Sequence, residues 1–405
     1  METLPNEILL HIFSYFEWFD MLTSFWPLNI RFNSLVCSTL SINDNRLNSA
    51  LIITHGLSYN KCCSILFPLI FNSSSLCSSI QRIHFDGTNS IACDLSYEWL
   101  FNDKKILRFP NLKTLILTRC GSIEPVVQCL SYLIKHQLDE LTLTFDGHVF
   151  KRFHYIEKYL SVASDKEKQL AMIEQLLCQL FSSQCQLTSR RLDINDDFEG
   201  GSIHRCLLSN SNFSSNYLPY QFRSYCMTLH HLYIRLNQIC FFHNLIEHVP
   251  NLEQMSVQFN CSLRSYSYVL TTSNIENLSQ SNENWFNKIL KLRCFSLKTF
   301  IDTDLEFIYL KWLLNNLNYV EKLELHLKSY DFIETKNHNI WKSFIDANFI
   351  RQYCLPDTIP NLVDFNFFIC SECELSYNDI ERITNSFKIH PFFHFTSMDK
   401  CQMFV

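Results

Sequence analysis

Two cysteines and two histidines late in the chain have a spacing that could bind zinc. Cys370 and Cys373 are separated by two residues, and His390 and His394, separated by three, follow after an interval of sixteen residues. Pro391 directly after His390 would disturb a helix that carried both imidazoles. Cys370 also fits the end of a repeated strand pattern described below. We therefore favour a structural role for these residues and predict no metal site.

Other common catalytic patterns are absent from the sequence. The six glycines never place three in a short window, which excludes glycine-rich phosphate loops. Acidic pairs such as Asp139-Glu140 and Asp196-Asp197 fit solvated turns or strand starts better than acid–base catalysis. We therefore expect a non-enzymatic protein without catalytic residues or cofactors. An unrecognised α/β enzyme remains an alternative, and it would require a deep polar pocket with strongly perturbed titratable groups.

Composition limits the class of protein further. The chain has 405 residues, 47% of them hydrophobic, and a net charge of −6. Lys and Arg form no dense run, so we expect no nucleic-acid partner, and no apolar stretch is long enough to span a bilayer. Eighteen scattered cysteines without a signal peptide favour free thiols in the cytoplasm or nucleus.

A leucine pattern recurs through most of the chain. Leu112-x-x-Leu115-x-Leu117-x-x-Cys120 has the form of a leucine-rich-repeat strand. Alternate apolar residues of such a strand point inward, and the next strand stacks beside it in parallel. Similar units begin at Ile80, Leu138, Leu229, Leu252, Leu297, Val320 and Leu362, with a weaker copy at Leu192-Asp-Ile194. The uneven spacing predicts an α/β fold in which an irregular leucine-rich-repeat-like solenoid of parallel strands carries insertions.

Segments between these units show helical periodicity or turn composition. A small polar residue at the ninth repeat position, such as Asn237, Asn260 or Cys370, can hydrogen-bond loop backbone. Three units share a Pro-Asn-Leu lead-in, at Pro110, Pro250 and Pro360. The pattern predicts a strand at 51–54, a loop at 72–79, a hinge at 37–48, and helices at 125–136, from a capping box at 164–167 through 180, at 304–317 and at 376–387.

The sequence of the N-terminal segment predicts three short helices. Pro5 suits the start of the first helix, and Glu7 adds negative charge there. Asp20 can cap a second helix that starts at Met21, and Pro27 forces a break before a third. A unit of about forty residues with this many large apolar side chains cannot bury them all in its own core. We therefore expect the remaining apolar side chains to contact another surface, either the rest of this chain or a second protein.

This segment resembles a known family. Leu4-Pro5-x-Glu7-Ile8-Leu9-x-x-Ile12-Phe13-x-Tyr15-Phe16, followed by Asp20-x-Leu22 and Arg31-Phe32, looks like an F-box. The resemblance covers about a tenth of the chain, and it implies docking on a Skp1-like adaptor and, through it, on a cullin. The residues expected at that interface are Leu4, Pro5, Ile8, Leu9, Ile12, Phe13 and Phe16.

The expected organisation is an F-box-like helical unit at 1–45 and a leucine-rich-repeat-like solenoid at 46–405. The resemblance implies a substrate-recruiting adaptor of a ubiquitin ligase, whose repeat array binds an unknown target protein. Two alternatives remain open. The N-terminal helices could simply cap a repeat scaffold without a ligase role, or the strands could belong to a generic α/β domain that is rich in leucine.

Overall fold

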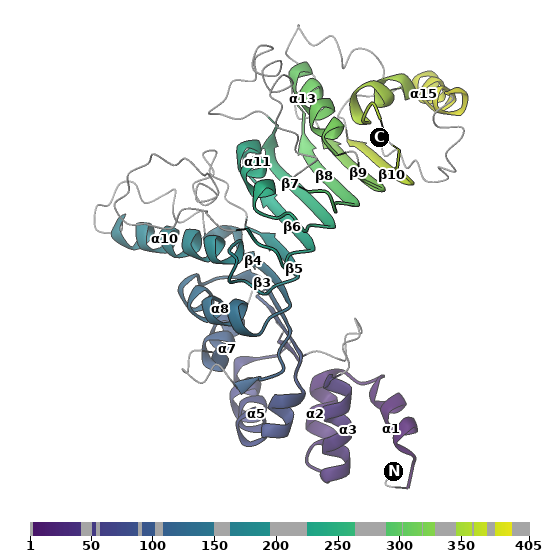
Figure 1. Ribbon diagram of the computed structural model, residues 1–405. Helices are drawn as coiled ribbons and strands as arrows, with labels where there is room; N and C mark the ends of the chain where they lie inside the picture. Colours follow the sequence, from purple (N-terminus) through teal and green to yellow (C-terminus); the bar gives the residue numbers. More distant parts are fainter. Residues whose placement is uncertain are drawn as a thin grey trace. The chain divides into compact units, whose positions relative to one another are not determined.

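The chain forms two compact units, which are described separately (Figure 1). The first comprises residues 1–180 and 184–195, and the second 181–183 and 196–405. The computed structural model describes residues 3–41, 51–53, 57–87, 91–101, 108–149, 163–194, 225–263, 289–301, 303–317, 319–328, 346–358, 360–370 and 377–390. The boundary predicted after residue 45 lies outside these ranges and stays a prediction.

The first unit combines the N-terminal helices with five strands. The strands β1 to β5 pair in chain order, and every pairing is parallel. Its elements are α1 (Asn6–Phe13), α2 (Trp18–Phe25), α3 (Ile30–Ser41), β1 (Leu51–Ile53), α4 (Tyr59–Lys61), a π-helical turn (Cys62–Leu66), α5 (Phe67–Asn72), α6 (Ser74–Ser79), β2 (Arg82–Asp86), α7 (Ile91–Phe101), β3 (Thr114–Cys120), α8 (Glu124–His136), β4 (Glu140–Phe145), α10 (Ala163–Leu180) and β5 (Ser189–Asp193).

The second unit is built in the same way. Strands β6 to β10 pair in chain order and in parallel. Its elements are β6 (His231–Leu236), α11 (Ile239–Glu247), β7 (Gln254–Ser262), β8 (Cys294–Phe300), α13 (Asp304–Asn315), β9 (Lys322–Lys328), α14 (Ala347–Phe349), a π-helical turn (Ile350–Cys354), β10 (Asp364–Cys370) and α15 (Tyr377–Ile389). The predicted α/β class with parallel strands is confirmed. None of the described helices is both long and apolar enough to cross a membrane.

The leucine pattern sets the register of the strands. Leu115 pairs with Leu141, and Leu117 pairs with Leu143 on the next strand. All four side chains are buried, because alternate residues of each strand face the same side of the sheet. Each such side chain contributes about 1.5–3 kcal/mol by leaving water. Stacking of equivalent apolar positions therefore forms the core of this unit.

One predicted repeat has the wrong register. The sequence pattern placed Leu297 at the first repeat position, but Leu297 pairs with Val257 and Phe295 pairs with Met255. The repeat therefore begins at Leu292, and Phe295 takes the place that leucine holds elsewhere. A phenylalanine at that position hid the true register, because both frames present large apolar residues at the required spacing.

Two of the three Pro-Asn-Leu lead-ins, those at Pro110 and Pro250, have a common structural role. Asn111 donates a hydrogen bond from its side-chain amide to the Ser78 carbonyl at 2.7 Å, and Asn251 donates to the Met227 carbonyl at 2.7 Å. Each asparagine thus ties its turn to the equivalent turn of the preceding repeat. At the ninth position, the Asn260 amide donates to the Asn237 side-chain oxygen at 2.7 Å, so a side-chain ladder joins these two repeats.

Several local predictions need correction. Residues 74–79 form helix α6 and no loop, because the Ser73 hydroxyl accepts a hydrogen bond from the Leu76 N–H and caps it. The predicted hinge begins inside α3, which continues to Ser41. Helix α10 begins at Ala163, one residue before the predicted cap Ser164. Asp20 lies in the first turn of α2 rather than before it.

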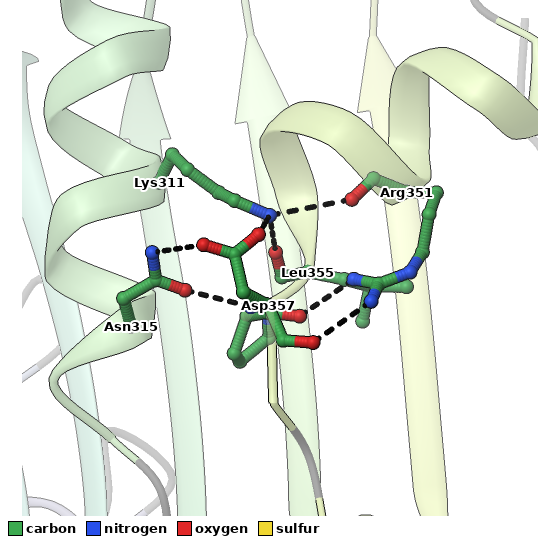
Figure 2. Close-up of polar contacts among 6 residues, drawn as sticks. Lys311, Asn315, Arg351, Leu355 and Asp357 are labelled. Atoms are coloured by element: carbon green, nitrogen blue, oxygen red, sulfur yellow. Dashed lines mark hydrogen bonds and ion pairs between the residues drawn. The ribbon is translucent and has the colours of Figure 1, made fainter.

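A polar network fastens α13 to the segment before β10 (Figure 2). The Lys311 ammonium donates to the Leu355 carbonyl at 2.6 Å and forms an ion pair with Asp357 at 2.8 Å. Asn315 exchanges two hydrogen bonds with Asp357, and the Arg351 guanidinium donates to the carbonyls of Pro356 and Asp357. The hydrogen bond from Lys311 lowers the pKa of Asp357.

Candidate partner-binding surface

Three phenylalanines form the centre of the N-terminal helices. The centroid of the Phe13 ring lies 4.5 Å from the Phe25 centroid and 6.3 Å from the Phe32 centroid. The Phe25 and Phe32 centroids are 5.9 Å apart. All three side chains are buried, and Leu9 one turn before Phe13 is buried as well. The i, i+4 spacing of Leu9 and Phe13 explains why both face this interior. These two residues hold the helices together.

Arg31 fixes the beginning of α1. Its guanidinium, near the start of α3, donates hydrogen bonds to the side-chain oxygen of Asn6 at 3.0 and 2.8 Å and to the Leu4 carbonyl. Two helix starts that are far apart in sequence therefore lie side by side. The Leu-Pro-Asn opening of the chain is held in place by the basic residue of the third helix.

The seven residues predicted for the adaptor interface fall into three groups. Leu9 and Phe13 are buried within the helices, so they support the surface from beneath. Leu4 and Ile12 are half-buried. Pro5, Ile8 and Phe16 are exposed, although the edge of the Phe16 ring also packs against Phe25.

The exposed apolar side chains form two groups, one along α1 and one at the start of α3. Ile8 is 47% exposed, Tyr15 is 77% exposed, and Ile12 lies between them at a spacing of four and three residues. Leu28 and Ile30 are 56% and 87% exposed at the start of α3. Arg31 ties that start to the beginning of α1, so these exposed residues belong to the same helical unit. We call Pro5, Ile8, Ile12, Tyr15, Phe16, Leu28 and Ile30 the N-terminal apolar surface.

Sequence reasoning missed three members of this surface. Tyr15 belongs to the family pattern but was not assigned to the interface, and Leu28 and Ile30 flank the turn after Pro27. Their signal was present in the sequence, because Leu28 and Ile30 are large apolar residues in and just after a proline-containing turn. Only the position of Arg31 against α1 shows where they lie.

The remaining faces of the helices contact the first unit. Helix α1 packs on α3, α2 packs on α3 and β1, and α3 packs on α6. The Ser41 hydroxyl at the end of α3 donates to the Ser79 carbonyl at 3.3 Å. The three helices are therefore anchored through α2 and α3, while α1 has α3 as its main support.

The zinc candidate is only partly described. Cys370 is the exposed last residue of β10, and His390 follows α15. Cys373 and His394 lie outside the described residues. Among the residues that are described, no three His, Cys, Asp or Glu side chains are grouped as a metal site would require.

Titratable groups with shifted pKa values in the first unit have structural explanations. Burial raises the pKa of Asp94, whose carboxylate accepts hydrogen bonds from the Gly121 N–H at 3.1 and 3.2 Å. Asp94 thereby ties α7 to the turn after β3. Burial also lowers the pKa of His84 on β2. Neither group supports the enzyme alternative.

Comparison with known proteins adds no identification. Neither the known protein families nor the curated proteins include a match to this chain. The N-terminal apolar surface therefore carries the functional argument by itself.

Proposed function

We propose that this protein is a substrate-recruiting adaptor of a Skp1-cullin-F-box type ubiquitin ligase. In this proposal, helices α1 to α3 bind a Skp1-like subunit, and a leucine-rich-repeat-like solenoid formed by the strands binds a target protein. The protein would supply proximity between target and ligase and no catalytic group.

The observation that carries the proposal is the N-terminal apolar surface. Tyr15 and Ile30 are 77% and 87% exposed on a unit whose own interior is already filled by Phe13, Phe25 and Phe32. Exposed apolar side chains grouped in this way mark contact sites for other proteins. Buried aromatic and aliphatic anchors dominate the affinity of such contacts.

The alternative is a repeat scaffold in which the helices are a terminal cap. The packing of α2 on β1 and of α3 on α6 favours this view. A cap buries its apolar face against the array and presents a polar outer face. Ile8 on α1 and Tyr15 just after α1 are instead exposed and apolar. Their exposure favours the adaptor role over the cap.

The test is capture of a purified Skp1-type protein by the full chain. The double variant Ile8→Asp/Tyr15→Asp should weaken capture at least tenfold, because it places two charges in an apolar contact. The matched control is Ile380→Asp/Tyr377→Asp on α15, whose side chains are 42% and 92% exposed. The control should bind like the unaltered protein. Failure of the unaltered chain to bind, or equal binding by both variants, would refute the adaptor role.

A further inference from the structure

The outward face of the second unit carries an unusual group of charges. Along β9 the residues Lys322, Glu324, His326 and Lys328 alternate with buried leucines, so all four point away from the helix-covered side. Lys298 on β8 pairs in register with His326. In Figure 1 helices α11 and α13 lie on the opposite side of these strands. On the described strands β8 to β10 this face therefore carries three lysines, one histidine and two carboxylates.

The face also carries two carboxylates, Glu324 on β9 and Asp364 on β10, and Asp364 pairs in register with Lys322. Glu324 accepts a hydrogen bond from the His326 ring at 2.7 Å. Lys298, Lys322 and Lys328 are exposed and form no hydrogen bond or ion pair with any residue that the structure describes. Three unpaired ammonium groups on one face contrast with the net charge of −6 of the whole chain.

An aromatic platform lies among these lysines. The rings of His326 on β9 and Phe368 on β10 stack with centroids 4.2 Å apart and an interplanar angle of 9°. Lys298 lies on the other side of His326, and Lys322 and Lys328 lie at the two ends of the same strand. The group spans roughly 20 Å, at about 3.3 Å per residue of strand. An extended peptide of several residues matches this length.

We propose that this face, formed by Lys298, Lys322, Lys328, His326 and Phe368, binds an acidic segment of the target protein. The carboxylates of such a segment would pair with the three lysines, and an apolar residue would pack on the stacked rings. Charge complementarity also steers association and makes it sensitive to salt. This inference rests on the proposed function, since it names the class of target that the adaptor recruits.

The test measures binding of fluorescein-labelled peptides to the full-length protein by fluorescence polarisation. The acidic probe is a twelve-residue peptide of alternating Glu and Ser with one central Phe, and the neutral probe has Gln at each Glu. We expect the acidic probe to bind at least tenfold more tightly, with affinity falling as salt rises. The variant Lys298→Glu/Lys322→Glu/Lys328→Glu should abolish this preference.

A control variant separates local from overall charge. Lys61→Glu/Lys113→Glu/Lys291→Glu makes the same change in net charge at exposed lysines elsewhere, and it should keep the preference for the acidic probe. Equal loss in both triple variants, or tighter binding of a poly-uridine RNA than of the acidic peptide, would overturn the proposal.

Capture of the Skp1-type protein by the same variants distinguishes the two proposals. If the acidic probe fails to bind while the adaptor is captured, the peptide surface is wrong and the proposed function stands. If the probe binds and the adaptor is never captured, the ligase role is wrong and the face belongs to a scaffold.

Discussion

At the scale of single residues, Arg31 connects two distant parts of the N-terminal helices. Its guanidinium donates two hydrogen bonds to Asn6 and one to the Leu4 carbonyl. Charge-assisted hydrogen bonds of this kind are among the stronger polar contacts in proteins. The residue therefore positions the N-terminal apolar surface without being an exposed apolar contact itself.

Replacing Arg31 with alanine should loosen α1 and leave α3 folded. Loss of these bonds should lower the local free energy of opening of α1 by about 1–2 kcal/mol. Hydrogen exchange measures this directly, as faster exchange of the Leu9 and Phe13 amides with unchanged protection in α3. Asn6→Ala should reproduce most of the effect, and the double variant should add little to it. Additive effects of the two substitutions would contradict a shared contact.

The sequence predicted more about strands than about their connections. Equivalent apolar positions identified most strands where leucine occupied the inward sites, but they gave the wrong register for β8, where Phe295 takes a leucine position. The copy at β5 was weak because Arg190 takes the position that Leu141 holds on β4. Arg190 is nevertheless buried, with its guanidinium 3.2 Å from the Cys185 sulfur. A buried arginine interrupts the alternation of apolar residues, so the local pattern alone could not identify this position as inward-facing.

At the scale of elements, the local pattern also failed to show which residues of the candidate surface are exposed. The apolar periodicity of α1 identified the residues of an amphipathic helix, but it could not separate Leu9 and Phe13 inside from Ile8 outside. That separation depends on where α3 lies, which is a tertiary contact. The exposure of Leu28 and Ile30 depends on the same contact, through Arg31.

The packing of α13 supplies an element-scale prediction. Lys311 is 17% exposed and connects α13 to Leu355 and Asp357. Lys311→Met should lower the free energy of unfolding by about 1–3 kcal/mol, because the Leu355 carbonyl loses its donor. Urea denaturation measures this change. Asp357→Asn should cost less than about 1 kcal/mol, since that carboxylate is 69% exposed and its ion pair is screened by solvent.

The pH dependence of this network has a defined sign. The folded state holds the pKa of Asp357 below its ordinary value, chiefly through the Lys311 hydrogen bond. The stability from this pair is therefore fully present above the ordinary aspartate pKa, and it is lost as pH falls through the folded value. The difference in melting temperature between the unaltered protein and Asp357→Asn should stay constant from pH 6 to about pH 4 and shrink below about pH 4. A difference that also stayed constant at the lower pH would exclude the ion pair as its source.

At the scale of the whole molecule, the cysteines report on how the interior is closed to solvent. The described cysteines are free thiols, and Cys63 and Cys370 among them are exposed. Burial raises the pKa of Cys129 to about 12 and raises the pKa of Cys120 and Cys354 as well. Because the thiolate is the reactive form, buried thiols of this kind should be inert in the folded protein.

Reaction with Ellman's reagent at pH 8 should therefore separate the thiols by rate. Cys63 and Cys370 should react at least about a hundredfold faster than Cys120, Cys129 and Cys354, whose thiolates require both deprotonation and opening of the core. The variant Cys63→Ser/Cys370→Ser should lose the part of the fast phase that these two residues contribute. In denaturant without reductant, all eighteen cysteines should react. A lower total would mean that disulfides form, and it would contradict the expectation of a reducing compartment on which the ligase proposal depends.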